Sequence, residues 1–241
     1  AQQFIPLPIE KVSLDWTRVA SYEHSSGGTY QKVLLIGIPG EVITLYQNIA
    51  KEAGLKLIGL EMEGLSLVRS LLSSDRKSTI LIDIGALATN IIVAERGLLR
   101  YGNQKDYGGM YLTHALAGSL GISMVRAEEL KRKKRFFTGP GDRELSTLLL
   151  SFLDVIIEEV SNVQKIYEDR YGEKIGAFTL TGGGATVAGI DLYLSKRLGL
   201  PAHPSFPLAD IAYDQALELI VKPLGLEISA AIGAARGYLA R

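Results

Sequence analysis

The sequence of 241 residues contains no cysteine, which excludes disulfides, thiol nucleophiles and thiolate metal sites. It has no excess of charge either, because 26 Lys and Arg residues balance 26 Asp and Glu residues. We therefore expect no nucleic acid partner and no direct membrane insertion. No uncharged apolar run approaches the roughly 20 residues of a membrane-spanning helix, and the N-terminus lacks a secretory signal pattern. These absences permit a reducing compartment and predict a soluble chain.

Common metal and nucleotide motifs are missing as well. The three histidines (His24, His114 and His203) are far apart in the sequence and show no metal-ligand spacing. There is no P-loop pattern, and the run from Gly182 to Val187 lacks the third glycine of a dinucleotide fingerprint. Neither a P-loop nor a Rossmann site is supported.

Hydrophobic residues make up 47% of the chain, enough for a substantial core. In the first third, hydrophobic periodicity and turn residues predict the order β-β-β-α-β-α. The predicted elements are a strand through Val12, Leu14 and Trp16, a loop at 25–28, a second strand directly after that loop, a buried strand at 32–38, a helix at 41–53, a strand at 55–61 and a helix near 65–72.

The remainder begins with strands and continues mainly with helices. Three strands with short turns (78–85, 89–97 and 98–102) should form an antiparallel meander. Helices are predicted at 111–120, 124–134, 143–171, 190–198 and 228–239, and a strand that ends in glycines at 175–184. The fold class is α/β or α+β.

Two segments, ILIDIGALATN and FTLTGGGATVAG, share one design, in which an apolar strand runs into a turn of small residues. Glycine costs conformational entropy on folding, so such turns suggest a close approach of backbone to a ligand, with phosphate the usual candidate. Asp83 ends the first strand and is suited to hold Mg²⁺ through water. The alternative is an ordinary hairpin turn with a capping Asp, and TGGG alone is weak evidence for a site.

The two turns, in this order, resemble the actin-like ATPase superfamily. DIGA at 83–86 with Thr89 and Asn90 is similar to its second phosphate hairpin, and LTGGGA at 180–185 is similar to its adenosine motif. EGLSL at 63–67 and AAIGAARG at 230–237 resemble the two connecting helices.

Within the superfamily, the chain resembles the PilM family of pilus assembly proteins along nearly all of residues 1–241. The resemblance is carried by FIPLP, VSLDW, EAGLKLIGLEMEGLSLVR, DIGALATN, GGMYLTHALAGSLGIS, AEELKRK and LTGGGATVAGI. It implies actin-like, ribonuclease H-like lobes with an inserted small α+β subdomain.

The resemblance also implies a domain division. Residues 1–62 would form the inserted, partner-binding subdomain, residues 63–77 the remainder of the first lobe with its connecting helix, and residues 78–241 the second lobe. The D-x-G-x-x-x-x-K hairpin that carries the family's first phosphate loop does not occur before Ala1. We expect that this opening segment is lacking here.

The resemblance assigns site residues by position. Asp83 would face the metal, the backbone of Gly85 and Ala86 would face phosphate, and Thr89 and Asn90 would fix the hairpin. Glu63 matches the residue that orients the attacking water in hydrolysing relatives. A carboxylate at a helix start explains Glu63 equally well.

Further residues are implied around the nucleotide. These are Gly108, Gly109 and Thr113 in a turn from the second lobe, Glu128 and Lys131 beside the ribose and base, and Gly182, Gly183, Gly184 and Thr186 around the adenine and α-phosphate. Turn geometry alone is the alternative for the glycines. The basic run KRKKR at 131–135 is expected to be a solvated helix end from Arg132 onwards.

The implied function is a scaffold that binds ATP or ADP with Mg²⁺, with slow hydrolysis at most. Its implied partner is the cytoplasmic N-terminal tail of a PilN-like inner-membrane protein, which would hold the chain at the membrane periphery; a homo-oligomer is possible. Alternatives are a cell-division filament protein of the FtsA type, a sugar kinase or phosphatase on the same scaffold, and a degenerate relative from type II secretion.

Overall fold

The chain divides into two compact units, residues 1–62 and residues 63–241. The computed structural model describes residues 8–24, 28–72, 77–133 and 143–239. Most of the loop predicted at 25–28, and the end of the basic run at Lys134 and Arg135, lie outside these residues. Over the part described, no helix combines the length and apolar character needed to cross a bilayer.

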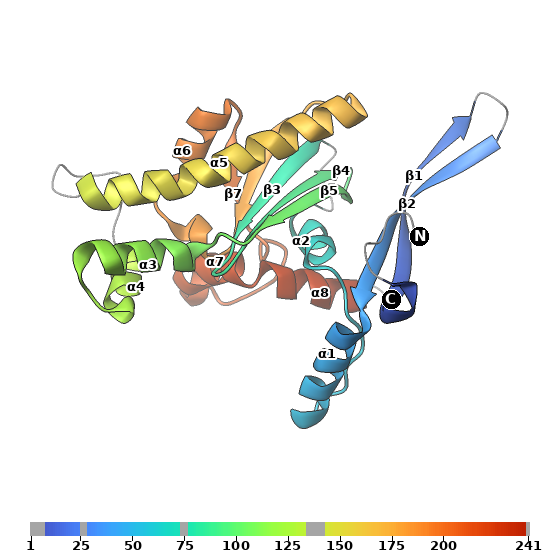
Figure 1. Ribbon diagram of the computed structural model, residues 1–241, viewed down its shortest axis with the longest axis horizontal. Coiled ribbons are helices and arrows are strands. Elements are labelled where there is room, and N and C mark those ends of the chain that lie inside the picture. The colour runs from blue at the N-terminus through green and yellow to red at the C-terminus, as the bar shows by residue number, and fades with distance from the viewer. Residues whose placement is uncertain (1–7, 25–27, 73–76, 134–142, 240–241) are drawn as a thin grey trace. The chain divides into compact units, whose positions relative to one another are not determined.

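The first unit is a long antiparallel hairpin followed by one helix (Figure 1). It contains β1 (Val12–His24), β2 (Gly28–Pro39) and α1 (Gly40–Glu52), so the first strand and the helix predicted at 41–53 are confirmed. Three predictions are wrong. The two strands predicted between the loop and this helix form one continuous strand, β2. Ile36 is the single buried residue of β2, so the strand at 32–38 is not a buried one. Residues 55–61 form no strand, because no neighbouring strand pairs with them.

The second unit is built on a five-stranded mixed sheet of order β5-β4-β3-β6-β7. Its strands are β3 (Ser78–Ile84), β4 (Thr89–Glu95), β5 (Leu98–Lys105), β6 (Ala177–Thr181) and β7 (Ala202–Pro204). The first three form the predicted antiparallel meander, and β6 lies parallel to β3. Two strands from distant parts of the sequence therefore end at the same edge of the sheet.

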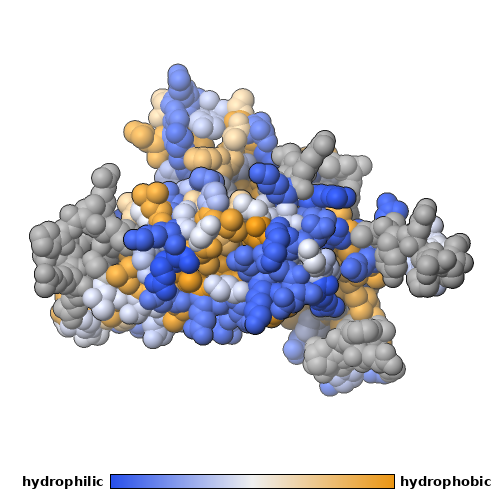
Figure 2. Space-filling model, turned by 90° about the horizontal axis from the view of Figure 1, so that it is seen from above, coloured by the Kyte–Doolittle hydropathy of each residue, from blue (hydrophilic) through white to orange (hydrophobic). Residues whose placement is uncertain are grey.

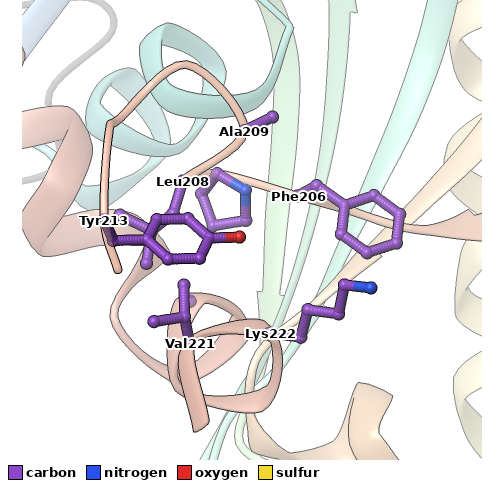
Figure 3. Close-up of a pocket in the computed structure, with 8 residues that line it drawn as sticks. Phe206, Leu208, Ala209, Tyr213, Val221 and Lys222 are labelled. Atoms are coloured by element: carbon purple, nitrogen blue, oxygen red, sulfur yellow. The ribbon is translucent and has the colours of Figure 1, made fainter. Parts of the chain in front are cut away.

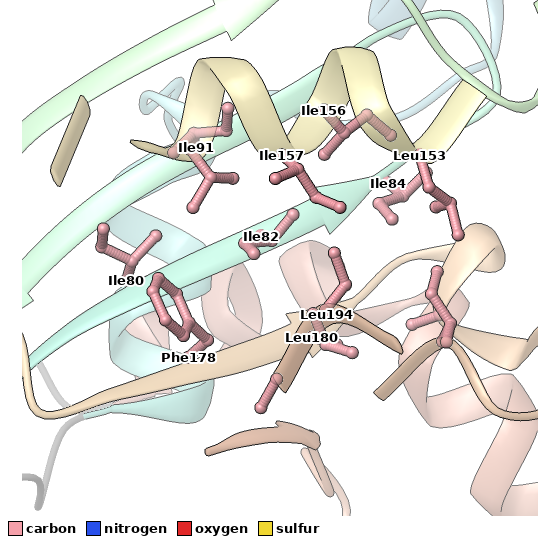
Figure 4. Close-up of a cluster of buried hydrophobic side chains, with 14 of the residues drawn as sticks. Ile80, Ile82, Ile84, Ile91, Leu153, Ile156, Ile157, Phe178, Leu180 and Leu194 are labelled. Carbon is pink, nitrogen blue, oxygen red and sulfur yellow. The ribbon is translucent and has the colours of Figure 1, made fainter. Parts of the chain in front are cut away.

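Helices cover both faces of this sheet (Figure 1). Ile80, Ile82 and Ile84 of β3 point toward Ile156 and other apolar side chains of the long helix α5 (Arg143–Tyr171), as Figure 4 shows. Alternate residues of a strand face opposite sides, so Leu81 and Asp83 belong to the other face, where α2 (Glu63–Leu71) packs. Every residue of β3 is buried as a result.

The remaining helices confirm the predicted positions to within a few residues. They are α3 (Gly109–Leu120), α4 (Met124–Lys133), α6 (Ile190–Leu198) and α8 (Ser229–Leu239). Two elements were not predicted, β7 and the helix α7 (Glu218–Glu227). On the face drawn in Figure 2, hydrophobic residues lie in the middle among hydrophilic ones.

Helices α2 and α8 approach closely enough for their backbones to touch. A Cβ on Gly233 of α8 would overlap the carbonyl group of Ser66 in α2. The guanidinium of Arg69 donates to the carbonyl oxygen of Gly233 at 2.8 Å. Because α2 begins at Glu63, this contact fixes the position of that carboxylate beside the sheet.

Candidate functional site

The carboxyl ends of β3 and β6 open into a cleft with a volume of about 710 Å³. Asp83 and Thr181 are paired neighbours at these two strand ends. Ligands of α/β proteins commonly bind where parallel strands end side by side. The sequence-predicted residues that line the cleft are Glu63, Asp83, Gly85, Ala86, Gly109, Glu128, Lys131, Gly182, Gly183, Gly184 and Thr186.

Two carboxylates meet at the floor of this cleft and share one donor. The Asn90 side-chain amide donates to Asp83 Oδ2 and to Glu63 Oε2, each at 3.1 Å. The pKa of Asp83 is raised to about 6. Burial is the largest cause, the hydrogen bond from Asn90 opposes it, and the negative charge of Glu63 adds to it. A divalent cation would relieve both the repulsion and the cost of burying the charge.

The turn after β3 is held by the start of α3. Gly85 donates its amide to the carbonyl of Ala88, and the carbonyls of Gly85 and Ala86 accept from the amides of Gly109 (2.9 Å) and Met110 (2.8 Å). The first donors of α3 are thus used to fix the turn. A ligand in the cleft meets a turn whose shape is already set.

Thr89, Asn90 and Gly108 stand behind the cleft lining. The buried Thr89 hydroxyl donates to the carbonyl of Tyr107 at 2.7 Å, which ties β4 to the segment before α3. A Cβ on Gly108 would lie 2.6 Å from the carbonyl oxygen of Ala86. Thr89 and Gly108 therefore shape the turn from behind rather than from within the cleft.

The three consecutive glycines after β6 differ in how much space a side chain would have at each position. Gly182 has φ 81°, and a Cβ there would lie 2.5 Å from Asp83 Oδ1; a Cβ on Gly184 would overlap the side chain of Ile84. Those two glycines are required by the packing of the protein itself. Gly183 differs, because its nearest neighbour for a Cβ is the Glu227 side chain at 4.0 Å. The protein's own packing leaves Gly183 with room for a side chain, on the wall of the cleft.

Two of these glycines leave their backbone amides without a partner in the part of the protein that the structure describes. Among the described residues, no acceptor is found for the amides of Gly183 and Gly184, whereas the Gly182 amide donates to the carbonyl of Leu226. The Thr186 hydroxyl donates to the Gly183 carbonyl at 2.7 Å and so stabilises the turn. Adjacent unpaired amides form a concavity that suits an anion.

Another part of the cleft lining, from α3 and α4, carries a tightly paired charge cluster. The Lys131 ammonium donates to the carbonyl of Gly109 (3.0 Å), to the Thr113 hydroxyl (2.9 Å) and to Glu128 Oε2 (2.7 Å). Partial burial raises the pKa of Glu128, but hydrogen bonds from Lys131, Thr113 and Arg132 outweigh it and lower the value to about 2. Glu128 is therefore a carboxylate with its acceptor geometry fixed.

Several lining residues were not predicted from the sequence. Leu112, Leu149, Phe152, Leu153 and Val187 give the cleft an apolar side, while Pro223 and Glu227 come from the unpredicted α7. Arg132 also lines the cleft, although it is 68% exposed as expected for a helix end. The helical spacing of Leu149, Phe152 and Leu153 predicts that one face of the helix is buried, but it does not indicate that this face borders the cleft.

The family described as type IV pilus assembly protein PilM matches residues 1–231. The chain belongs to the PilM family. In the solved structure of a PilM–PilN type IV pilus biogenesis complex, the matching chain is 22% identical, with a TM-score of 0.81 over 98% of this PilM-family chain and 69% of that one.

More distant solved structures share the fold of this PilM-family chain. MreB5 of Spiroplasma citri bound to AMPPNP is 16% identical, with a TM-score of 0.61 over 82% of this chain and 64% of that one. The ethanolamine utilization protein EutJ from Carboxydothermus hydrogenoformans is 25% identical, with a TM-score of 0.52 over 76% of this chain and 59% of that one. These matches confirm the predicted actin-like fold of the PilM-family chain, which spans about three fifths to two thirds of their lengths.

Proposed function

We propose that this PilM-family chain is a nucleotide-binding scaffold of the type IV pilus assembly platform. It binds ATP or ADP with Mg²⁺ in the cleft of residues 63–241, and residues 1–62 hold the cytoplasmic N-terminal tail of a PilN-like inner-membrane protein. The observation that carries the nucleotide proposal is Gly183. A glycine on a cleft wall, with room for a Cβ and an unpaired amide, is explained by a ligand that approaches the backbone.

The cleft residues fit a magnesium nucleotide. The amides of Gly183 and Gly184 suit phosphate oxygens, and the buried pair Asp83 and Glu63 suits a hydrated Mg²⁺. The volume of about 710 Å³ lies within the range of small-molecule sites, about 300–1,000 Å³. MreB5, which shares the fold, has been solved with AMPPNP and with ADP.

The other wall is suited to the nucleoside. The fixed Glu128 carboxylate can accept from ribose hydroxyls, because its pKa of about 2 keeps it ionised at neutral pH. Lys131 holds that carboxylate in place, and the apolar residues Phe152 and Val187 offer a surface for the base. We propose Glu63 as the residue that orients water in a slow hydrolysis, since Asn90 fixes its Oε2.

Residues 1–62 carry features of a peptide-binding surface. Directly paired strand residues project from the same face, so Trp16 and Leu35 lie together, with Leu14 and Val33 next to them on that face. All four are exposed, Trp16 by 60%. Within the described residues no third strand pairs with β1 or β2, so an extended peptide could add to an open edge. The solved complex of a PilM with PilN, which shares this fold, supports a PilN-like occupant.

Titration calorimetry with magnesium ADP and ATP tests the nucleotide proposal. Gly183→Val should weaken binding by about tenfold or more, because its side chain fills the space next to the free amides. Gly118→Val is the matched control, since Gly118 lies in α3 with open space around it. Equal affinity of the two variants would contradict a nucleotide at this wall.

The single tryptophan of the chain gives a direct test of the partner. Trp16 fluorescence should change when a synthetic peptide of a PilN-like N-terminal tail is added. Val33→Ser, on the same face as Trp16, should weaken peptide binding by about tenfold. Leu192→Ser, at an exposed position of α6, should leave peptide binding unchanged. A peptide that leaves the fluorescence and its own anisotropy unchanged at high micromolar concentration would refute the partner assignment.

A further inference from the structure

A smaller cavity of the second unit, of about 170 Å³, is lined mainly by apolar side chains. Figure 3 shows the rings of Phe206 and Tyr213 on two sides of it, with Lys222 of α7 below. The Lys222 ammonium is already paired with Glu218 at 2.7 Å. The polar groups that can recognise a small ligand lie instead in the cleft, and the Glu128 carboxylate is one of them.

The Glu128 carboxylate accepts hydrogen bonds from three side chains among the described residues. Its Oε2 accepts from the Lys131 ammonium at 2.7 Å and from the Thr113 hydroxyl at 2.6 Å, and its Oε1 accepts from Arg132 Nε at 2.9 Å. An ionised carboxylate offers about four acceptor positions, two on each oxygen. With these donors in place, Oε2 is fully used and one position on Oε1 stays open to the cleft, since the side chain is 32% exposed.

The single hydrogen of the Thr113 hydroxyl belongs to the contact with Glu128. Thr113 Oγ1 lies 2.6 Å from Glu128 Oε2 and 3.0 Å from the carbonyl oxygen of Gly109. Two oxygens 2.6 Å apart need a hydrogen between them, and Glu128 has none to give, because its pKa of about 2 keeps it ionised at neutral pH. Thr113 itself is 1% exposed, so it acts on a ligand only through Glu128.

The Lys131 ammonium has no donor left for a ligand. An ammonium carries three donors, and those of Lys131 go to the Gly109 carbonyl, the Thr113 hydroxyl and Glu128 Oε2. Gly109 leaves the space for this arrangement, since a Cβ there would lie 3.2 Å from Lys131 Nζ. Lys131 therefore lines the cleft but holds Glu128 rather than the ligand.

These contacts decide which ligand groups the carboxylate can recognise. Glu128 can only accept, and one of its positions is open. A sugar hydroxyl that donates one hydrogen therefore fits. Two neighbouring hydroxyls bound by both carboxylate oxygens do not fit, because Oε2 has no position left.

We propose that Glu128 recognises a single ribose hydroxyl through the open position on Oε1, and that Lys131 and Thr113 are positioning residues that leave only this position open. The inference rests on the proposed nucleotide function and deepens it. The ligand it assigns is a ribonucleotide of which one ribose hydroxyl, not both, contributes to affinity.

Titration calorimetry with ADP, 2′-deoxy-ADP and 3′-deoxy-ADP on the 241-residue chain tests this assignment. One of the two deoxy analogues should bind about tenfold or more weaker than ADP, because the hydrogen bond it loses has a charged acceptor. The other analogue should bind within about twofold of ADP. The fluoro analogue at the sensitive position should be as weak as the deoxy analogue, since fluorine cannot donate a hydrogen.

The contrary outcomes separate this inference from the proposed function. No binding of ADP would contradict the nucleotide site itself and the inference with it. Binding of ADP with both deoxy analogues weakened, or with neither weakened, would overturn the inference alone. So would a fluoro analogue that binds as well as ADP.

Thr113→Val tests the positioning role, because it keeps the buried shape and removes the hydroxyl. It opens a second position on Oε2 and releases one donor of Lys131. Affinity for ADP should fall to that of the sensitive deoxy analogue, whose own affinity should stay within about twofold. A merely structural effect would weaken both ligands equally, and Thr113→Ser, which keeps the hydroxyl, should restore the discrimination.

Lys131→Met is the second positioning variant, in case Thr113→Val reduces folding, and it should also abolish the discrimination. The matched control is Arg126→Met on the same helix, since Arg126 pairs with Glu129 at 3.0 Å with the same i,i+3 spacing as Glu128 and Lys131. This exposed pair should leave both affinities within about twofold. Full discrimination retained in Lys131→Met and in Thr113→Val would overturn the positioning role.

Discussion

Asp83 offers the sharpest test of the site, because its carboxylate is buried even in the protein without a bound ligand. Its side chain sits at 8% exposure on the cleft floor, with Asn90 as donor and Glu63 as a neighbouring charge. Burial is the largest cause that raises its pKa from 3.8 to about 6. Asp83→Asn keeps the shape of the side chain and removes the charge.

The expected effect follows from the two pKa values. For an acid whose pKa is raised on folding, the stabilising contribution is complete below the unfolded value and is lost as pH rises through the folded value. A separation between 3.8 and about 6 corresponds to about 3 kcal/mol in the free energy of unfolding. Asp83→Asn should therefore be more stable than the wild type by up to about 3 kcal/mol above about pH 7, and the gain should vanish below about pH 4.

Urea unfolding followed by circular dichroism, in steps from about pH 4 to about pH 8, measures this difference. Asp169→Asn, at an exposed position of α5, is the control and should change the free energy of unfolding by less than about 0.5 kcal/mol. A loss of stability in Asp83→Asn that is the same at all pH values would refute the reasoning. It would mean that the carboxylate is needed for packing or hydrogen bonding in the folded protein.

Three further predictions concern the same unit. Asn90→Leu removes the donor shared by Asp83 and Glu63, so magnesium nucleotide affinity in calorimetry should fall by about tenfold. Gly233→Ala forces α8 away from α2 and should cost about 2–4 kcal/mol in urea unfolding. Tyr167→Phe removes the buried hydroxyl next to Ser78 and Glu95 and should cost about 1–2 kcal/mol in the same assay.

Each of these three has a contrary outcome. Unchanged nucleotide affinity in Asn90→Leu would show that the two carboxylates need no common donor. A Gly233→Ala variant as stable as Gly118→Ala, which has open space around it, would show that the helix contact can relax. Wild-type stability in Tyr167→Phe would mean that its hydroxyl contributes no net hydrogen-bond energy.

Local patterns in the sequence were sufficient to predict most helices and strands of the second unit. The apolar run of β3 and the turn residues between 85 and 98 fixed the meander, and the periodicity of 143–171 gave α5 with its observed bounds. The convergence of Asp83 and Gly183 at one cleft came instead from the resemblance of two distant motifs. The parallel pairing of β3 with β6 is the contact that brings them together.

Two errors have different physical causes, and the first is that the pairing partners of a strand are not visible locally. Leu55, Leu57 and Leu60 alternate or nearly alternate as in a strand, yet residues 55–61 have no strand to pair with. Helix α7 was missed because Pro223 lies in its interior. The carbonyl deprived of a donor belongs to Leu219, whose residue is 89% exposed, so water can satisfy it at little cost.

The hydrogen bonds from Asn90 to both carboxylates could not be predicted from the sequence either. Asn90 was expected to fix the hairpin, but its contact with Glu63 depends on how α2 packs beside β4. That packing depends in turn on Gly233, which is 167 positions away from Ser66. No periodicity connects such residues.

Helix α7 is the partition between the two cavities of the second unit. Pro223 and Glu227 line the larger one, while Val221, Lys222 and Gly225 line the smaller one. A displacement of this ten-residue helix toward one cavity therefore narrows that cavity and widens the other. Any molecule that prefers one position of α7 on one side must, by thermodynamic reciprocity, alter the affinity for a molecule on the other side by the same factor.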